Sequence, residues 1–158
     1  MILSVTGHRP HLLGGYHVQP ALEHLALVTL ADMAPRLVCT GMAQGWDMAV
    51  AGACVTLGIP FVAVVPGFMP PHTQDDRWPA ATRARYAQLL AAAVEVECRP
   101  WPGARREYHD RDMRLVQRCD QMLALWNGDE RTGTGATVKM ARAAGRPVRN
   151  VWGMWDAQ

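Results

Sequence analysis

The chain has 158 residues, about half of them apolar, and 16 basic and 14 acidic residues give it a formal net charge of +2. A chain of this length forms one domain of common size that buries roughly 70% of its unfolded surface, so it needs no disulfide or metal to fold. The small net charge excludes a strong electrostatic footprint for a nucleic-acid duplex, whereas a small anionic ligand needs only a local basic patch.

The cysteines also indicate no metal. Cys39, Cys54, Cys98 and Cys119 form no C-x-x-C pair and match no zinc spacing, so we expect reduced thiols, no metal and no cofactor. No apolar run approaches the roughly 18 residues of a membrane span, and no charged segment followed by an apolar one resembles a signal peptide. We therefore expect no membrane partner and a cytoplasmic location.

The first predicted strand, residues 1–6, organises the chain. It is apolar without polar alternation, which is typical of a strand buried on both faces of a parallel sheet. It ends at Gly7, His8 and Arg9, and ligands of open α/β sheets bind just beyond the carboxyl ends of the strands. These three residues are therefore candidates for ligand binding, and the alternative is an ordinary turn that ends a strand.

A predicted helix, residues 20–34, leads to a second strand, 36–40, and then to a glycine-containing loop before a helix at 48–57. The backbone N–H groups at the start of a helix attract anions. Asp47 either caps this helix or accepts a hydrogen bond from a ligand hydroxyl. The candidate binding residues of this loop are Gly41, Gln44, Gly45 and Asp47.

The third strand is predicted at 59–65 and is followed by an irregular segment, 68–80, in which Arg77 and Trp78 are candidates for covering a ligand. A plain surface anchor is an equally good interpretation of Trp78. A helix at 81–93 then precedes a strand at 94–98, whose apolar–polar alternation indicates a position near the edge of the sheet.

The last part of the chain is predicted to contain a helix at 108–119, a strand at 121–126, a helix at 138–144 and a strand at 146–152. The loop before the helix at 138 supplies four more candidate binding residues: Gly133, Thr134, Gly135 and Thr137. Trp152 and Trp155 either cover an interface or pack against their own sheet.

The repeated order of strand, loop and helix predicts an α/β fold with a mostly parallel central sheet and helices on both faces, formed by a single domain spanning residues 1–158. Three loops that combine glycine with polar groups, at 7–9, 41–47 and 127–137, follow strands of this sheet. Because such loops meet at one sheet edge, we expect them to form one pocket.

Several common motifs are absent or weak. No Gly-Lys-Ser/Thr of a phosphate-binding P-loop occurs, and Gly133-Thr134-Gly135 lacks the third glycine of the dinucleotide fingerprint. Ser4, the only serine, lies inside the first strand, which argues against a serine hydrolase.

Residues 40–49, TGMAQGWDMA, resemble the G-x-x-x-G-x-D signature of the SLOG superfamily, which groups DprA/SMF proteins with the LOG family. The opening Gly7-His8-Arg9-Pro10 and Gly14-Gly15-Tyr16 are similar to its YpsA-like branch. Further on, residues 108–112, Asp120 and Gly133-Thr134 resemble the LOG run M-H-x-R-K, Asp and P-G-G-x-G-T followed by Glu. The likeness extends over nearly the whole chain.

The resemblance implies a Rossmann-like three-layer sandwich, a nucleotide or nucleotide-derived ligand, and a homodimer or higher homo-oligomer. LOG enzymes cleave the N-glycosidic bond of nucleoside 5′-monophosphates with an Arg and a Glu, and Arg111 occupies the Arg position. The Glu position falls near Ala136 or Thr137, so that carboxylate is missing, and Asp112 replaces the motif's Lys. Losing a positioned acid or base commonly costs about 10²–10⁴-fold in rate, and Asp47 or Asp112 could substitute.

Two functions of different class therefore follow. The first is a binding module in which Arg9 or Arg111 pairs with a phosphate and Asp47 and Gln44 contact the sugar or base. The second is a LOG-like phosphoribohydrolase. A nucleic-acid ligand is disfavoured by the charge, and Arg111 could instead pair with Asp112 or Asp120 of the protein itself.

Overall fold

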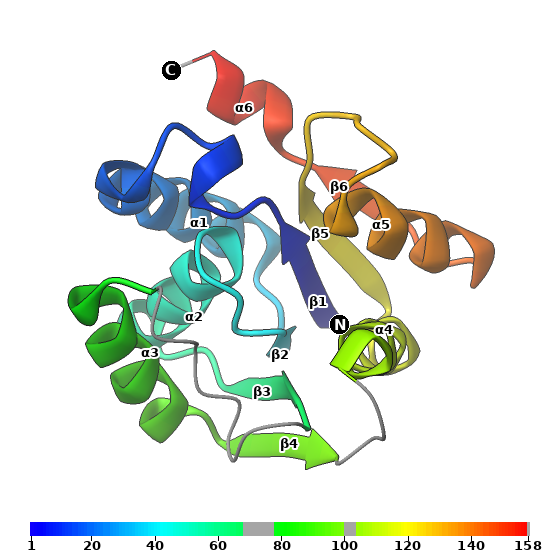
Figure 1. Ribbon diagram of the computed structural model, residues 1–158, viewed down its shortest axis with the longest axis horizontal. Coiled ribbons are helices and arrows are strands. Elements are labelled where there is room, and N and C mark those ends of the chain that lie inside the picture. The colour runs from blue at the N-terminus through cyan, green and yellow to red at the C-terminus, as the bar shows by residue number, and fades with distance from the viewer. Residues whose placement is uncertain (68–77, 100–103, 158) are drawn as a thin grey trace.

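Parallel strands form one sheet at the centre of the protein, whose computed structural model describes residues 1–67, 78–99 and 104–157 (Figure 1). Within these ranges the sheet has six strands: β1 (Ile2–Gly7), β2 (Leu37–Thr40), β3 (Phe61–Pro66), β4 (Glu95–Arg99), β5 (Gln121–Leu125) and β6 (Val148–Asn150). Their order across the sheet is β4-β3-β2-β1-β5-β6, and every pair is parallel. The predicted α/β sheet is confirmed.

Helices cover both faces of this sheet (Figure 1). On one face lie α1 (Gln19–Met33), α2 (Trp46–Leu57) and α3 (Ala80–Ala92), and on the other lie α4 (Ala104–Arg118) and α5 (Gly133–Ala143). Two 3₁₀ turns, η1 (Pro10–Leu12) and η2 (Tyr16–Val18), precede α1, and a short helix, α6 (Trp152–Asp156), follows β6. This is the three-layer Rossmann-like sandwich that the resemblance implied.

The central strands are buried on both faces because helices cover both sides of the sheet. Successive side chains of a strand point to opposite sides, so each strand packs against both layers of helices. In β3, Phe61, Ala63 and Val65 belong to the large core under α1 and α2, while Val62 and Val64 pack with Leu115 of α4 on the opposite side. This explains why the apolar runs show no polar alternation. At the free edge, Val96 of β4 is 42% exposed, which confirms the predicted edge strand.

The strand order changes direction at β1, and this places the functional edge. From β1 the chain proceeds outward through β2, β3 and β4, and then returns across the sheet to add β5 and β6 on the other side of β1. Such a switch point leaves a crevice beyond the carboxyl ends of the adjacent strands. The loops that follow β1, β2 and β5 surround this crevice.

Several predicted boundaries differ from the structure. α5 begins at Gly133 and not at 138, because the Thr132 hydroxyl caps it by accepting a hydrogen bond from the Gly135 N–H at 3.0 Å. The last strand ends at Asn150, and the residues expected to be a tail form α6. Trp152 and Trp155 pack against the large core, which favours the second of the two roles considered for them.

Trp78 is neither a surface anchor nor a cover for a ligand. Its side chain is 7% exposed and belongs to the large core, with its ring 5.7 Å from that of Tyr86 in an edge-on arrangement. Arg77, the other candidate cover, lies outside the described residues. No helix in the described ranges combines the length and apolar character that crossing a membrane requires.

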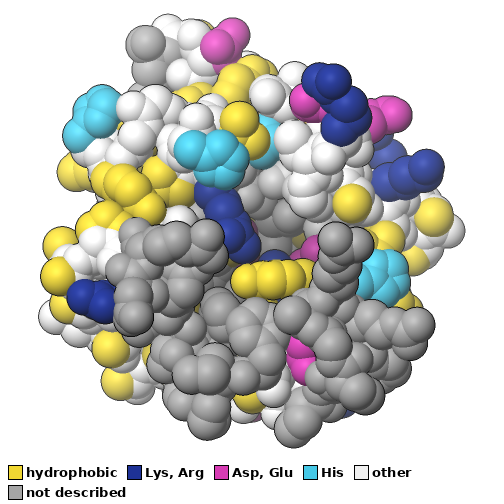
Figure 2. All heavy atoms as spheres, viewed as in Figure 1, with side chains coloured by type: hydrophobic (Ala, Val, Ile, Leu, Met, Phe, Trp, Pro, Cys, Tyr) yellow, Lys and Arg dark blue, Asp and Glu magenta, His cyan; other side chains and the backbone are white. Residues whose placement is uncertain are grey.

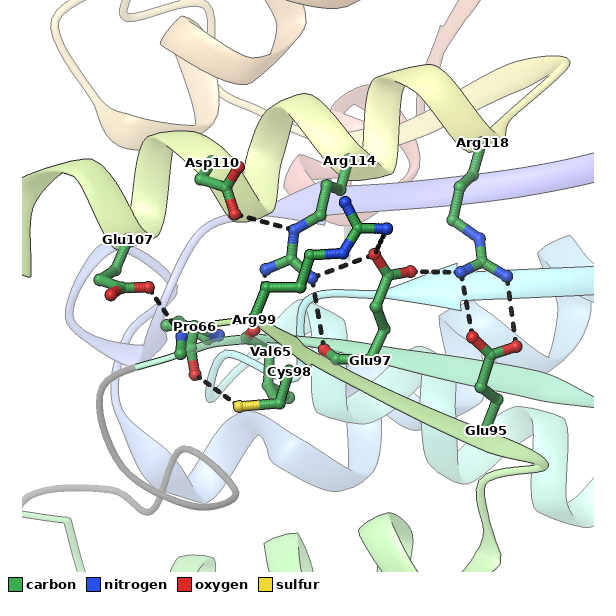
Figure 3. Close-up of polar contacts among 11 residues, drawn as sticks. Val65, Pro66, Glu95, Glu97, Cys98, Arg99, Glu107, Asp110, Arg114 and Arg118 are labelled. Atoms are coloured by element: carbon green, nitrogen blue, oxygen red, sulfur yellow. Dashed lines mark hydrogen bonds and ion pairs between the residues drawn. The ribbon is translucent and has the colours of Figure 1, made fainter. Parts of the chain in front are cut away.

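An ionic network around the buried Arg114 anchors α4 to the edge of the sheet (Figure 3). Arg114 of α4 is 4% exposed, and its guanidinium contacts the Val65 carbonyl at 3.1 Å and carboxylate oxygens of Glu97 and Asp110 at 3.2 and 3.0 Å. Arg118 adds ion pairs to Glu95 and Glu97. Burial opposes ionisation of Glu97, but the hydrogen bonds from Arg114 and Arg118 outweigh it and hold its pKa below the usual value.

The end of β3 is tied to the same helix. The carboxylate of Glu107, which is 1% exposed, accepts a hydrogen bond from the Gly67 N–H at 2.9 Å. Together these contacts fix the position and rotation of α4, and this matters because other residues of α4 face the crevice.

We expect Arg114→Ala to destabilise the protein by about 3 kcal/mol, because it removes a buried guanidinium that contacts the Val65 carbonyl and the partly buried carboxylates of Glu97 and Asp110. The matched control is Arg99→Ala, since Arg99 also pairs with Glu97 Oε1, at 3.3 Å. Its side chain is 67% exposed, so we expect loss of this ion pair to cost less than about 1 kcal/mol. Urea unfolding measures both free energies. Equal losses in the two variants would contradict the anchoring role of Arg114.

Candidate ligand-binding site

A cavity of about 400 Å³ lies at the carboxyl ends of the strands, over β1. Its walls come from the end of β1 and the loop after it, the loop after β2, and the helices α4 and α5. The lining residues are Thr6, Gly7, His8, Arg9, His11, Leu12, Ala43, Asp47, Tyr108, Arg111, Asp112, Leu115, Thr132, Gly133, Thr134 and Thr137. In Figure 2 the centre of the visible face is hollowed, and basic and histidine side chains gather beside the hollow.

Arg111 lies at the base of this cavity and is 7% exposed. Its Nε donates to Asp112 Oδ1 at 2.6 Å, and its Nη1 donates to the Gly41 carbonyl at 2.8 Å. Burial opposes the charge of Arg111, but the neighbouring carboxylates of Asp112 and Asp47 outweigh it and raise the pKa. The pairing of Arg111 with Asp112 is one of the two that the sequence left open, whereas Asp120 instead accepts a hydrogen bond from the Ile2 N–H.

Asp112 is itself held from the other side. The Thr137 hydroxyl lies 3.0 Å from Asp112 Oδ2 and 3.1 Å from the Gly133 carbonyl, and Thr137 is 1% exposed. Thr137, Asp112, Arg111 and Gly41 thus form one continuous polar chain from α5 through α4 to the loop after β2. Thr137 acts in this chain by positioning Asp112.

Arg9 provides a second cation on the cavity wall. Among the described residues it forms no ion pair with a carboxylate, and its guanidinium carbon lies 5.8 Å from the ring centroid of Tyr108. Arg111 lies 5.6 Å from the same centroid. The Tyr108 ring therefore holds both guanidinium groups at one wall through cation–π attraction, each worth roughly 0.5–2 kcal/mol.

Asp47 is buried in the first turn of α2, at 5% exposure. Its Oδ2 accepts a hydrogen bond from the Ala43 N–H at 3.3 Å, while its Oδ1 has no hydrogen-bond partner among the described residues. Burial raises the pKa of Asp47 to about 7, and the positive charge of Arg111 opposes that rise. The carboxyl group thus changes its charge near neutral pH inside the cavity.

His8 links the loops after β1 and β5. Its Nε2 accepts a hydrogen bond from the Asn127 N–H at 3.0 Å, so the proton of the neutral ring lies on Nδ1, which has no partner among the described residues. Burial lowers the pKa of His8, which is 1% exposed, and its ring meets Trp152 edge-on. The neutral imidazole therefore joins the two loops through Nε2, while its Nδ1–H group remains available to a ligand.

The start of α5 faces the same cavity. The N–H groups of Gly135 and Ala136 are taken by Thr132, through its hydroxyl at 3.0 Å and its carbonyl at 3.0 Å. The N–H groups of Gly133 and Thr134 have no partner in the described part of the chain, and both residues line the cavity. Of the first four N–H groups of α5, those of Gly133 and Thr134 therefore remain for a ligand.

Four predicted binding residues lie away from the cavity wall. Gly41 stands behind Arg111, and a Cβ there would lie 2.7 Å from Arg111 Nη1, so the glycine makes room for the guanidinium. Gln44 and Gly45 line a neighbouring cavity of about 230 Å³, where Gln44 Oε1 accepts a hydrogen bond from the Tyr16 hydroxyl. A Cβ on Gly135 would lie 2.6 Å from the Asp129 carbonyl, so its role is close packing.

The other eight predicted residues do line the cavity: Gly7, His8, Arg9, Asp47, Arg111, Gly133, Thr134 and Thr137. Sequence reasoning did not single out Tyr108, His11 or Leu12. Tyr108 lies one helical turn before Asp112 and so shares its face of α4, which was a usable signal. Among the described residues, no group of three His, Cys, Asp or Glu side chains is arranged to hold a metal ion.

Comparison with solved structures gives the same fold at low sequence identity. TM1055 superposes with a TM-score of 0.60 at 16% identity, over 93% of this chain and 71% of its own. DNA processing protein A (DprA) from Streptococcus pneumoniae gives a TM-score of 0.63 at 18% identity, over 94% of this chain and 49% of its own.

A third structure is that of DprA from Helicobacter pylori, which concerns its binding of single-stranded DNA. It gives a TM-score of 0.64 at 14% identity, over 95% of this chain and 64% of its own. This chain thus spans 49% and 64% of the length of the two DprA chains. No family model and no curated protein matches the sequence. The likeness is one of fold, and it agrees with the SLOG resemblance drawn from the motifs.

Asp47→Asn should stabilise the protein at pH 8 and have little effect near pH 4. The folded-state pKa of Asp47, about 7, lies above the ordinary value of 3.8, so the folded protein holds this proton more tightly and the ionised group opposes folding as pH rises. The gain at pH 8 has an upper bound of about 4 kcal/mol, and each kcal/mol corresponds to a rise of about 2–4 °C in Tm. Calorimetry at both pH values measures it, and an equal gain at both would contradict a buried, unpaired carboxyl group.

Proposed function

We propose that the cavity binds a small phosphorylated ligand, a nucleotide or a nucleotide derivative. The observation that supports this most is the meeting of Arg9, Asp47, Arg111 and Thr134 in one cavity. These residues are up to 125 positions apart in the sequence, since 134 minus 9 is 125. Only the switch in strand order at β1 brings their loops and helices together.

The phosphate belongs at the start of α5. The Gly133 and Thr134 N–H groups and the positive end of the helix dipole favour an anion there. The Thr134 hydroxyl adds a donor, and Arg9 adds a cation that has no carboxylate partner among the described residues. An arginine that is already paired, as Arg111 is with Asp112, is the weaker choice for the main phosphate contact.

The sugar belongs toward Asp47. Its Oδ1 is a buried polar atom without a partner among the described residues, and a ribose hydroxyl supplies either a donor or an acceptor for it. A cavity of about 400 Å³ falls in the usual range for small-molecule sites, roughly 300–1,000 Å³, and suits a nucleoside monophosphate. Cavity size, charge and orphaned polar atoms therefore support the same ligand class.

Hydrolysis of the N-glycosidic bond is the second candidate, and one contact favours it. Asp112 lies 3.0 Å from the Thr137 hydroxyl, and Thr137 is one of the two positions at which the LOG-like motif would place its Glu. A carboxylate is thus present at that place although it comes from a different helix. A carboxylate that activates water is one of the two groups that glycosidic hydrolysis uses, and the other is an acid that protonates the leaving group.

Single-stranded DNA is the competing ligand, because the DprA from Helicobacter pylori binds it. A net charge of +2 gives this chain little general attraction for a polyanion, and such binding would weaken steeply with salt. The expectation that nucleic acid is not the ligand stays a prediction, and so does the expectation of a homodimer or higher homo-oligomer.

AMP at 100 times its dissociation constant should stabilise the protein by about 2.7 kcal/mol, which corresponds to a rise of roughly 5–10 °C in Tm. Arg9→Ala should weaken AMP binding about 10–100-fold, because it removes a charge-assisted hydrogen bond. The matched control is Arg142→Ala, because Arg142 also lies over an aromatic ring, that of Trp126 at 5.6 Å, but away from the cavity. Thermal shift and isothermal titration measure these effects.

A panel of nucleoside mono-, di- and cyclic phosphates extends the same experiment. No shift with any of them would exclude the proposal. Tight binding of an oligothymidylate at low salt, unaffected by Arg9→Ala, would favour a DNA-binding surface outside the cavity instead.

If the protein is a hydrolase, adenine should be released from AMP, and Asp112→Asn should reduce the rate by about 10²–10⁴-fold. Asp32→Asn is the control, because Asp32 is exposed and pairs with Arg149, far from the cavity. Chromatography of the free base measures the reaction. Complete recovery of AMP after long incubation at high protein concentration would leave the binding function alone.

A further inference from the structure

The cavity contains equal numbers of arginine and acidic side chains, but only one arginine and one acidic side chain among the described residues form an ion pair with each other. Arg9 and Arg111 carry two positive charges, and Asp47 and Asp112 carry two negative charges when ionised. Arg111 is committed to Asp112 and to the Gly41 carbonyl. Asp47 forms no ion pair among the described residues and receives a single hydrogen bond, from the Ala43 N–H.

The cavity therefore has two charge states that differ by the proton on Asp47. The net charge of these four side chains is zero when Asp47 is ionised and +1 when Asp47 is neutral. The groups that face Asp47 from the packed elements are Arg111 and Asp112 of α4, Arg9 of the loop after β1 and the Ala43 N–H of its own loop. His11 of η1 also lines the cavity.

An anion beside Arg9 changes the balance at Asp47. It compensates the Arg9 charge that helps to stabilise the carboxylate, and it adds a negative charge in a buried region where charges interact strongly. Protonation of Asp47 removes both penalties. Its unpartnered Oδ1 is the place for that proton, since no protein group competes for it in the described part of the chain.

We propose that an anion enters this cavity together with one proton, which Asp47 takes up from solvent. The inference rests on the proposed function and adds its regulation: the site is a proton-coupled anion site. Ligand affinity then rises as pH falls. The free-state pKa of Asp47, about 7, makes the proton uptake measurable at neutral pH.

The test uses sulfate, whose charge does not change between pH 6 and 8. With a free-state pKa of about 7 and a higher pKa in the sulfate-bound state, linkage makes sulfate bind up to about tenfold more weakly at pH 8 than at pH 6. Amide chemical shifts of the intact protein measure the dissociation constant at each pH. The ¹³C shift of the Asp47 carboxyl group, assigned by its loss in Asp47→Asn, reads its pKa directly, and saturating sulfate should raise that value.

Asp47→Asn is the decisive variant, because the amide resembles the neutral carboxyl group and can still accept the Ala43 hydrogen bond. It should bind sulfate at pH 8 as tightly as the wild type does at pH 6, with little pH dependence. Asp32→Asn, an exposed acid on α1, should keep the full pH dependence. His11→Gln should keep most of it, which separates Asp47 from the imidazole on the cavity wall.

The outcomes separate the two proposals. Equal sulfate affinity at both pH values, or an Asp47 pKa that sulfate leaves unchanged, overturns proton coupling while anion binding stands. A pH dependence that survives in Asp47→Asn and is lost in His11→Gln assigns the proton to His11 and also overturns it. No binding of sulfate or AMP at either pH overturns the proposed function as well.

Discussion

The contact between the Arg111 guanidinium and the Gly41 carbonyl, at 2.8 Å, joins the two halves of the sheet over β1. Arg111 comes from α4, which crosses back to the far side of the sheet, and Gly41 comes from the loop after β2. A side chain at position 41 would collide with the guanidinium, so the close approach depends on glycine. Because Asp112 and Thr137 continue the chain of contacts to α5, one buried cation sets the distances between three walls of the cavity.

That arrangement depends on the other side of α4. Arg114 and Arg118 hold the helix to β4 through Glu97 and Glu95, and Arg114 also holds it to β3 through the Val65 carbonyl, which fixes the residues of α4 that face the cavity. Tyr108, Arg111 and Asp112 are the ones presented there. Two ionic networks on one helix thus have separate functions, one in anchoring the helix and the other in shaping the site.

The electrostatics of the site favour binding over rapid chemistry. Asp112 is held by Arg111 and Thr137, so it is well placed but strongly engaged, while Asp47 forms no ion pair among the described residues and, with a pKa of about 7, is about half protonated at neutral pH. If the proposed proton coupling holds, the site responds to both ligand and pH. The fold itself does not decide among these functions, since a similar fold occurs in DprA and TM1055 at 14–18% identity.

The sequence by itself determined the architecture and named eight of the 16 residues that line the candidate cavity. Uninterrupted apolar runs identified the buried parallel strands, and glycine with polar residues after those strands identified the loops that meet at one edge. It could not place Gln44, Gly45 and Gly135 outside the cavity, because which way a loop residue points depends on packing against loops distant in the sequence. Only the tertiary structure decided that Arg111 pairs with Asp112 and that Asp47 has no ion pair in the described part of the chain, because burial and ion pairing arise from neighbours that the chain brings together when it folds.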